Sequence, residues 1–195
     1  AGTSHFLGQN FAKAFDVKFA DKSGKLEYVW ATSWGVSTRL MGALIMSHSD
    51  DNGLVLPPFL APTQVILIPV IKAKENSDQI VEKSNEMNSK LKDMGVRVKI
   101  DDRENISLGS KLYDSEVKGI PIRIVIGLKE IENNSADIFY RHNMSKVHMS
   151  FDKIVDKIFE SIESIQDNMI NLSNEKLKNN THEVNSYDDF KNLIE

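Results

Sequence analysis

A candidate anion site lies near the start of the sequence, where Arg39 directly follows Ser37 and Thr38. The residues from Arg39 to Ser47 are apolar nearly all round, which predicts a helix buried against a sheet. A guanidinium in the first turn of a buried helix is costly unless it meets an anion. The N-terminus of a helix also favours negative charge. The pattern therefore predicts a phosphate-binding site at Arg39, and the alternative is an arginine paired with a buried carboxylate.

This site needs a strand that turns directly into a helix. Val29 to Trp34 is rich in β-forming residues, and Ser37 or Thr38 suits the N-cap of the helix. The elements expected before it are a short helix at 7–15 and two strands at 16–20 and 25–31, joined by a hairpin turn at 21–24.

A second pattern begins after residues 57–62, whose three prolines stop a helix and favour extended chain. Beyond them the expected order of elements is β-α-β-α-β-β-β-α, which predicts a mixed sheet with helices packed on it. The expected strands are 64–71, 96–100, 120–127, 136–141 and 146–151, and the expected helices are 77–94, 108–117 and 152–172. Residues 173–195 are polar and rich in Asn and Lys, with a short helix expected at 187–194. The sequence thus predicts an α/β (α+β) fold with domains at 1–60 and 63–172, and at 173–195 a linker and the start of a C-terminal domain.

Two strings in the first domain resemble the class II aminoacyl-tRNA synthetases. The order strand, turn, arginine, apolar helix is similar to motif 3 of that class. Residues 32–39, Thr-Ser-Trp-Gly-Val-Ser-Thr-Arg, and residues 53–58, Gly-Leu-Val-Leu-Pro-Pro, are similar to prolyl-tRNA synthetases of the archaeal and eukaryotic type. Residues 2–11, Gly-Thr-Ser-His-Phe-Leu-Gly-Gln-Asn-Phe, resemble a second hallmark of that family. Two such strings in the expected order are more specific than one short motif, and they imply that residues 1–60 are the C-terminal part of an antiparallel catalytic sheet.

The resemblance implies an ATP site formed by Thr3, Ser37 and Arg39. In the implied reaction the carboxylate of proline attacks the α-phosphate of ATP, which arrives with Mg²⁺, so the protein mainly positions phosphates and neutralises their charge. Arg39 would hold the γ-phosphate end, and the two hydroxyls would border ATP. The alternatives are a strand-end hydroxyl for Thr3 and a helix cap for Ser37.

The resemblance also implies a pocket for proline at His5, Trp34 and Gly35. A neutral imidazole can pack on a pyrrolidine ring and still donate a hydrogen bond, although a lone histidine is usually structural. Trp34 could instead belong to the core, and Gly35 could serve only to let the backbone approach a ligand.

Two strings in the second domain, residues 101–105 and 118–124, resemble signatures of the class IIa anticodon-binding domain. The candidate readers of the anticodon are Asp102, Arg103, Lys118 and Arg123. Arg and Lys can contact guanine edges or phosphates, and Asp can accept from exocyclic amines. The alternative for each of them is ordinary surface charge.

The resemblance implies a homodimeric, cytoplasmic enzyme that acts on L-proline, ATP and tRNA(Pro). It implies that motifs 1 and 2 precede Ala1, so we expect the chain to be the C-terminal part of a longer enzyme and inactive alone. The net charge of −4 counts modestly against a broad nucleic-acid face, and the alternative function is a stand-alone RNA-binding module with a non-catalytic flank. A nucleotide-binding enzyme of another class lacks support, because the sequence has no P-loop or Rossmann fingerprint.

No metal site and no membrane contact are expected. The sequence has no cysteine for a thiolate zinc site, and no apolar run approaches the roughly 20 residues that span a bilayer. His48, Asp50 and Asp51 stand where a helix end and a glycine turn favour such residues, and their spacing fits no ligand pattern.

Overall fold

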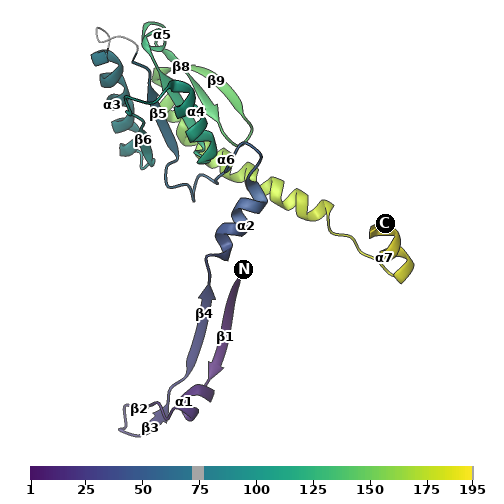
Figure 1. Ribbon diagram of the computed structural model, residues 1–195. Coiled ribbons are helices and arrows are strands. Elements are labelled where there is room, and N and C mark those ends of the chain that lie inside the picture. Colours follow the sequence, from purple (N-terminus) through teal and green to yellow (C-terminus); the bar gives the residue numbers. More distant parts are fainter. Residues whose placement is uncertain (72–76, 195) are drawn as a thin grey trace. The chain divides into compact units, whose positions relative to one another are not determined.

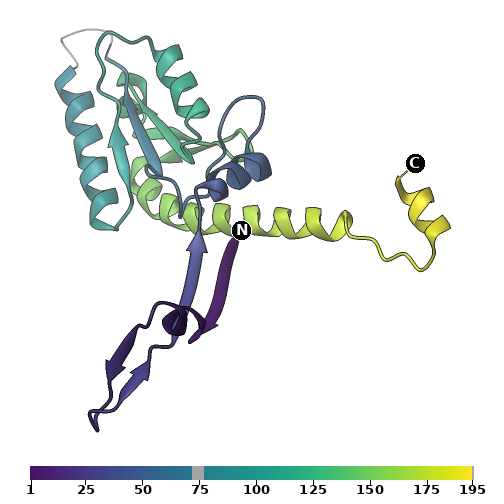
Figure 2. The ribbon, with the colours of Figure 1, turned by 60° about the horizontal axis from the view of Figure 1, so that its bottom comes forward.

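The computed structural model describes residues 1–71 and 77–194. The chain divides into two compact units, Ala1–Met46 and Ser47–Glu195. Figures 1 and 2 show the elements of both units in the colours of the sequence.

The first unit consists of two antiparallel ribbons and a short helix. β1 (Gly2–Gly8) pairs with β4 (Ala31–Val36), and β2 (Lys18–Ala20) pairs with β3 (Leu26–Tyr28), while α1 spans Asn10–Ala14. The predicted hairpin turn between β2 and β3 is confirmed. The Asp21 carboxylate accepts hydrogen bonds from the backbone N–H groups of Ser23 and Lys25, at 2.8 and 2.9 Å, and Gly24 has a φ of +83°. Strand β1 was not predicted, because Gly-Thr-Ser-His-Phe-Leu-Gly lacks a strand-like alternation of apolar and polar residues.

Helix α2 (Arg39–His48) begins in the first unit and was predicted to be buried against a sheet, which is wrong for this chain. None of its residues is buried, and Met41 and Met46 are 65% and 80% exposed. Ala12 is the one buried residue of the first unit. The apolar pattern of α2 correctly indicates a helix with a surface suited to burial, but the pattern contains no information on which surface would cover it.

The second unit is built on a five-stranded mixed sheet in the order β6-β5-β7-β8-β9. The strands are β5 (Val65–Pro69), β6 (Val98–Ile100), β7 (Ile122–Ile126), β8 (Ser135–Tyr140) and β9 (Ser145–Ser150). β6, β5 and β7 run parallel, whereas β7, β8 and β9 are antiparallel neighbours. The predicted mixed α/β sheet is confirmed.

Helices cover both faces of this sheet (Figures 1 and 2). The helices of the unit are α3 (Ser77–Asp93), α4 (Leu108–Val117), α5 (Leu128–Glu132), α6 (Phe151–Asn179) and α7 (Tyr187–Ile194). The main core lies between one face and helices α3 and α6, where alternate strand residues such as Leu67, Ile124 and Ile138 are fully buried. Ile66 and Ile68 face the other side and pack with Leu112 of α4.

Two helices differ from the prediction. α5 was not predicted, and it is a single short turn in which the Glu130 carboxylate accepts from the backbone N–H of Gly127 at 3.0 Å. α6 continues to Asn179 rather than ending at 172, although its buried positions end at Met169. Its last ten residues are exposed, and a helix of that composition needs no apolar stripe to continue. No helix in the two described stretches is long and apolar enough to cross a membrane.

Candidate functional site

The pairing of β1 with β4 arranges the predicted ligand residues of the first unit on the two faces of one ribbon. Thr3 lies opposite Gly35, and His5 lies opposite Ser33. Directly opposite residues of an antiparallel pair share a face, and alternate residues do so along a strand. Thr3, His5 and Gly35 therefore lie on one face, whereas Trp34, which is 80% exposed, lies on the other.

Gly35 gives this face of the ribbon its shape. A Cβ atom at Gly35 would lie 3.1 Å from the Oγ1 atom of Thr3, so any larger residue would crowd the threonine hydroxyl. The glycine thus leaves the Thr3 hydroxyl accessible beside a bare stretch of backbone, which is an arrangement suited to a ligand that approaches closely.

Arg39 stands at the start of α2, as the sequence predicted. The Ser37 hydroxyl accepts from the backbone N–H of Arg39 at 3.4 Å, which is a weak cap. The Arg39 side chain is exposed and has no hydrogen bond or ion pair within residues 1–71 and 77–194. The alternative of a buried carboxylate partner therefore has no support in this chain, and the guanidinium is available to an anion at the helix N-terminus.

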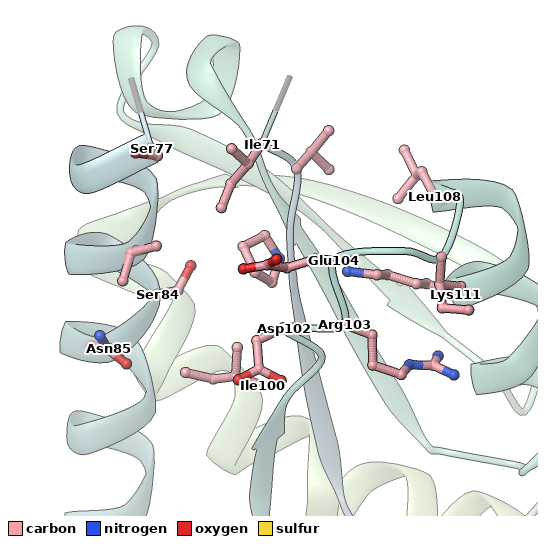
Figure 3. A pocket seen from close by; sticks show the side chains of 14 residues that line it. Ile71, Ser77, Ser84, Asn85, Ile100, Asp102, Arg103, Glu104, Leu108 and Lys111 are labelled. Carbon is pink, nitrogen blue, oxygen red and sulfur yellow. The ribbon is translucent and has the colours of Figure 1, made fainter. Parts of the chain in front are cut away.

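The second unit contains a hollow of about 720 Å³ at the carboxyl ends of β5 and β6. Its walls come from α3, from the loop after β6 and from the start of α4 (Figure 3). Of the residues that the structure describes, the polar side chains that line it are Ser77, Ser84, Asn85, Asp102, Arg103, Glu104 and Lys111. Ile71, Val81, Ile106 and Leu108 add an apolar lining, so the hollow combines apolar surface with hydrogen-bonding groups, as ligand sites do.

Arg103 joins the floor of the hollow to α4. Its guanidinium donates to both carboxylate oxygens of Asp101, at 2.8 and 2.7 Å, and to the carboxylate of Asp114 at 2.8 Å. Asp101 is 5% exposed, and its bond to Arg103 lowers the pKa of its carboxyl group below the ordinary value. Lys111 is also buried and donates to the backbone carbonyl of Asp101 at 2.9 Å. These bonds fix the shape of the loop that carries Asp102 and Glu104.

Asp102 and Glu104 are open carboxylates of the hollow. Both are exposed, and neither has a hydrogen bond or ion pair in the part of the chain that the structure describes. Carboxylates in this state can accept from the amino and imino groups of an unpaired base.

The structure separates the four predicted anticodon readers. Asp102 and Arg103 line the hollow, whereas Lys118 and Arg123 do not. Lys118 is exposed at the C-terminal end of α4. Arg123 is 5% exposed, lies 4.1 Å from the centroid of the Phe139 ring and pairs with Glu116 at 2.8 Å. Its guanidinium therefore supports α4 in this conformation rather than facing solvent.

Sequence reasoning missed several lining residues. Glu104 belongs to a string that was singled out, but its carboxylate was not. Lys111 carries no motif, and Ser84 and Asn85 belong to a helix in which no functional residue was predicted. Only the meeting of α3, the loop after β6 and the start of α4 brings these residues together.

Known proteins resemble the chain over both units. The family described as "Anticodon binding domain" matches residues 64–161. Proteins named "Proline--tRNA ligase" from Christiangramia forsetii and Phocaeicola vulgatus are 50% and 52% identical to it over 100% of this chain and 39% of each relative. The chain thus spans about 40% of the length of the curated relatives it matches.

Two crystal structures of prolyl-tRNA synthetase from Cryptosporidium parvum are similar at 41% identity over 96% of this chain. One, complexed with L-proline and AMP, has a TM-score of 0.82, and the match covers 40% of that enzyme's chain. The other, complexed with halofuginone and AMPPNP, has a TM-score of 0.80, and the match covers 38% of its chain. Because the family match over residues 64–161 takes in half of the 195 residues and coincides with the mixed sheet and its hollow, the chain belongs to the anticodon-binding domain family.

Proposed function

We propose that this chain is part of a proline–tRNA ligase, which activates L-proline with ATP and transfers it to tRNA(Pro). The observation that carries the proposal is similarity over the whole chain to proteins of that name. The similarity takes in the ribbon, helix α2 with Arg39, and the domain with the hollow. It therefore favours one enzyme over an RNA-binding module with an unrelated flank.

The first unit contributes to the formation of prolyl-adenylate. A carboxylate oxygen of proline attacks the α-phosphorus of ATP, and the bond to the departing pyrophosphate breaks. Arg39 binds the γ-phosphate end of ATP, with Mg²⁺ accompanying the nucleotide, and Thr3 and Ser37 donate hydroxyl hydrogen bonds nearby. The guanidinium lies in the first turn of α2 and has no ion pair among the described residues, which supports the role of Arg39.

His5 and Gly35 contribute to the proline pocket. Their place on one ribbon face with Thr3 supports a shared site for proline and ATP. Trp34 belongs to the proposed pocket as well, but its place on the opposite face favours a role in packing behind the ribbon rather than contact with the same ligand atoms.

The second unit recognises the anticodon of tRNA(Pro). Asp102 accepts from base amino groups, and Arg103, held by two carboxylates, fixes the loop that presents it. Lys118 provides a cation for the RNA backbone, and Arg123 contributes by holding α4. Single-stranded bases in a mixed apolar and polar hollow are a usual target of RNA-binding domains.

The finer assignments belong to the same proposal. The enzyme is of the archaeal and eukaryotic type, which the strings at 2–11 and 32–39 and the likeness to the Cryptosporidium parvum enzyme support, although the curated relatives named above are bacterial. It acts as a cytoplasmic homodimer. Residues 1–60 form the end of the catalytic domain, 63–172 the anticodon-binding domain, and 173–195 a linker and the start of a C-terminal domain.

The decisive test uses the full-length protein and measures ATP–pyrophosphate exchange driven by each of several amino acids. Exchange driven by proline alone, together with prolylation of a proline tRNA, is the expected result. Changing the two guanines of the anticodon should weaken prolylation, and tRNA binding should weaken as salt rises. RNA binding without any exchange would instead support the binding-module alternative.

A further inference from the structure

The turn that comes after α2 along the chain is fastened to other elements of the second unit. We call residues Asp50–Leu54 the clasped turn. Its ends are joined by two backbone hydrogen bonds between Asp50 and Gly53, at 3.2 and 3.1 Å, and the N–H of Leu54 donates to the carbonyl of Val117 at 3.0 Å. Val117 is the last residue of α4, so the turn is joined to the C-terminal end of that helix.

Arg141, just after β8, holds the clasped turn. Its guanidinium donates to both carboxylate oxygens of Asp50, at 2.9 and 2.5 Å, and to the carbonyl oxygens of Gly53 and Glu116, at 3.2 and 3.1 Å. The Arg141 side chain is 1% exposed. A buried guanidinium is tolerated because it is paired and its donors are satisfied, so Asp50 is the anion that this position requires.

Two glycines allow the turn to lie directly on α4. A Cβ atom at Gly53 would lie 2.5 Å from the Cα atom of Val117, and a Cβ at Gly119 would lie 2.7 Å from Leu54. Both glycines have positive φ angles, of +133° and +65°. The contact is thus backbone against backbone, which leaves no room for the turn to shift without α4.

α4 also forms a wall of the hollow. Leu108 and Lys111 near its start line the hollow, whereas Glu116 and Val117 at its end contact Arg141 and the clasped turn. Arg123 stiffens the end of the helix through bonds to the carbonyl of Leu112 and the carboxylate of Glu116, at 2.9 and 2.8 Å. One rigid helix of 10 residues therefore touches both the hollow and the turn after α2.

We propose that Asp50 and Arg141 are positioning residues for aminoacylation, which tie the turn after α2 to the helix that lines the hollow. This inference rests on the proposed function. We call the pairing of Arg141 with Asp50 of the clasped turn the clasp. An anticodon in the hollow fixes the start of α4, and the clasp carries that constraint to the end of α2, the helix that begins with Arg39. Loss of the clasp leaves each site able to bind its own ligand but makes the charging rate less sensitive to the anticodon.

The existence of the clasp is tested on the 195-residue chain by amide hydrogen exchange. In Asp50→Asn the N–H of Leu54 should exchange on the order of tenfold faster, because a charge-assisted pair is lost. The N–H of Leu67, in the centre of the sheet, should be unaffected. Glu86→Gln, which removes two ion pairs on α3, is the matched control and should leave Leu54 unchanged. Unaltered exchange at Leu54 in Asp50→Asn would overturn the clasp.

The coupling is tested on the full-length protein with two tRNAs, one with its own anticodon and one with the two guanines replaced. The measured quantity is the kcat for prolylation of the tRNA with its own anticodon divided by the kcat for the tRNA with replaced guanines. In Asp50→Asn this ratio should fall on the order of tenfold, a usual size for coupling between sites. Proline-driven pyrophosphate exchange without tRNA, and the Kd for tRNA, should stay at wild-type values. Arg141→Lys, which keeps the charge but loses the fork, should change the ratio in the same direction, and Glu86→Gln should not.

An unchanged ratio, or an equal fall in prolylation of both tRNAs and in pyrophosphate exchange, would overturn the positioning role and leave the pair as a structural element. A wild-type protein that charges no tRNA would overturn the proposed function and the coupling with it. The exchange experiment would still decide separately whether the clasp exists.

Discussion

Replacing Gly119 by alanine should destabilise the second unit far more than the same change at Gly95. Both glycines have positive φ angles, +65° and +81°, so both alanines pay a left-handed backbone cost of about 1–2 kcal/mol. At Gly95 nothing lies within 4 Å of the added Cβ atom, whereas at Gly119 three atoms of Leu54 lie at 2.7 Å. Overpacking of this kind adds about 1–3 kcal/mol, which is the expected difference in the free energy of unfolding between the two variants.

The assay is urea unfolding of residues 47–194, because the two units of the whole chain need not unfold together. Far-UV circular dichroism is the probe, since both tryptophans lie in the first unit. Gly95→Ala is the matched control. Equal losses of stability in the two variants would refute the reasoning, because they would mean that Leu54 moves away from α4 at no cost.

Four further outcomes are expected from the structure. Arg39→Ala in the full-length protein should reduce proline-driven pyrophosphate exchange by more than a hundredfold, since a charge-assisted clamp on phosphate is lost; exchange within a few-fold of wild type would remove Arg39 from the site. His5→Ala should raise the KM for proline more than the KM for ATP, and an equal rise in both would contradict a proline contact. Hydrogen bonds from Lys90 and Lys83 lower the pKa of Glu86 to about 2. The Glu86 carboxylate therefore stabilises the fold at pH values above its ordinary pKa near 4.5, and this stabilisation is lost as the pH falls toward 2. An NMR titration should give that value for Glu86 and a higher one in Lys90→Gln. A chain of residues 63–194 should melt at a lower temperature than one of 47–194, because it lacks both Asp50, the partner of Arg141, and the buried Val55; equal melting temperatures would argue that these contacts do not stabilise the second unit.

Most elements of the second unit could be predicted because their signals are local. Ser107 accepts from the N–H of Ser110 as the N-cap of α4, and Gly95 comes after α3 with a left-handed φ angle. The alternation of Ile122, Ile124 and Ile126 marks a strand with one face in the core. Each of these signals depends on residues that are close in the sequence.

Burial and register in the first unit could not be predicted, since both depend on distant partners. The resemblance implied a common site for His5 and Trp34, but the pairing of β1 with β4 decides which face each occupies. The apolar residues of α2 predicted that the helix is buried, but they do not specify which surface covers it, and none of its residues is buried in this chain.

The candidate site in the second unit was predictable where a string carried it and not elsewhere. Asp102 and Arg103 stand in a recognisable string, and both line the hollow. Arg123 was predicted to read the anticodon or, alternatively, to be ordinary surface charge, but α4 covers that face of the sheet and supplies Glu116 as its partner. Lys111 enters the hollow only because α4 packs beside the loop after β6, a juxtaposition that no local pattern encodes.

The pairing of Asp50 with Arg141 also bears on the order in which the chain folds. The two residues are 91 positions apart, so closing the loop between them costs considerable entropy and gains little until the sheet and α4 exist. The pair should therefore be absent from the transition state for folding, and its loss should speed unfolding while leaving the folding rate almost unchanged. A contact that forms only after the transition state acts on the unfolding rate alone. The Asp50–Arg141 pair should therefore lengthen the lifetime of the native state without changing how fast the chain reaches it.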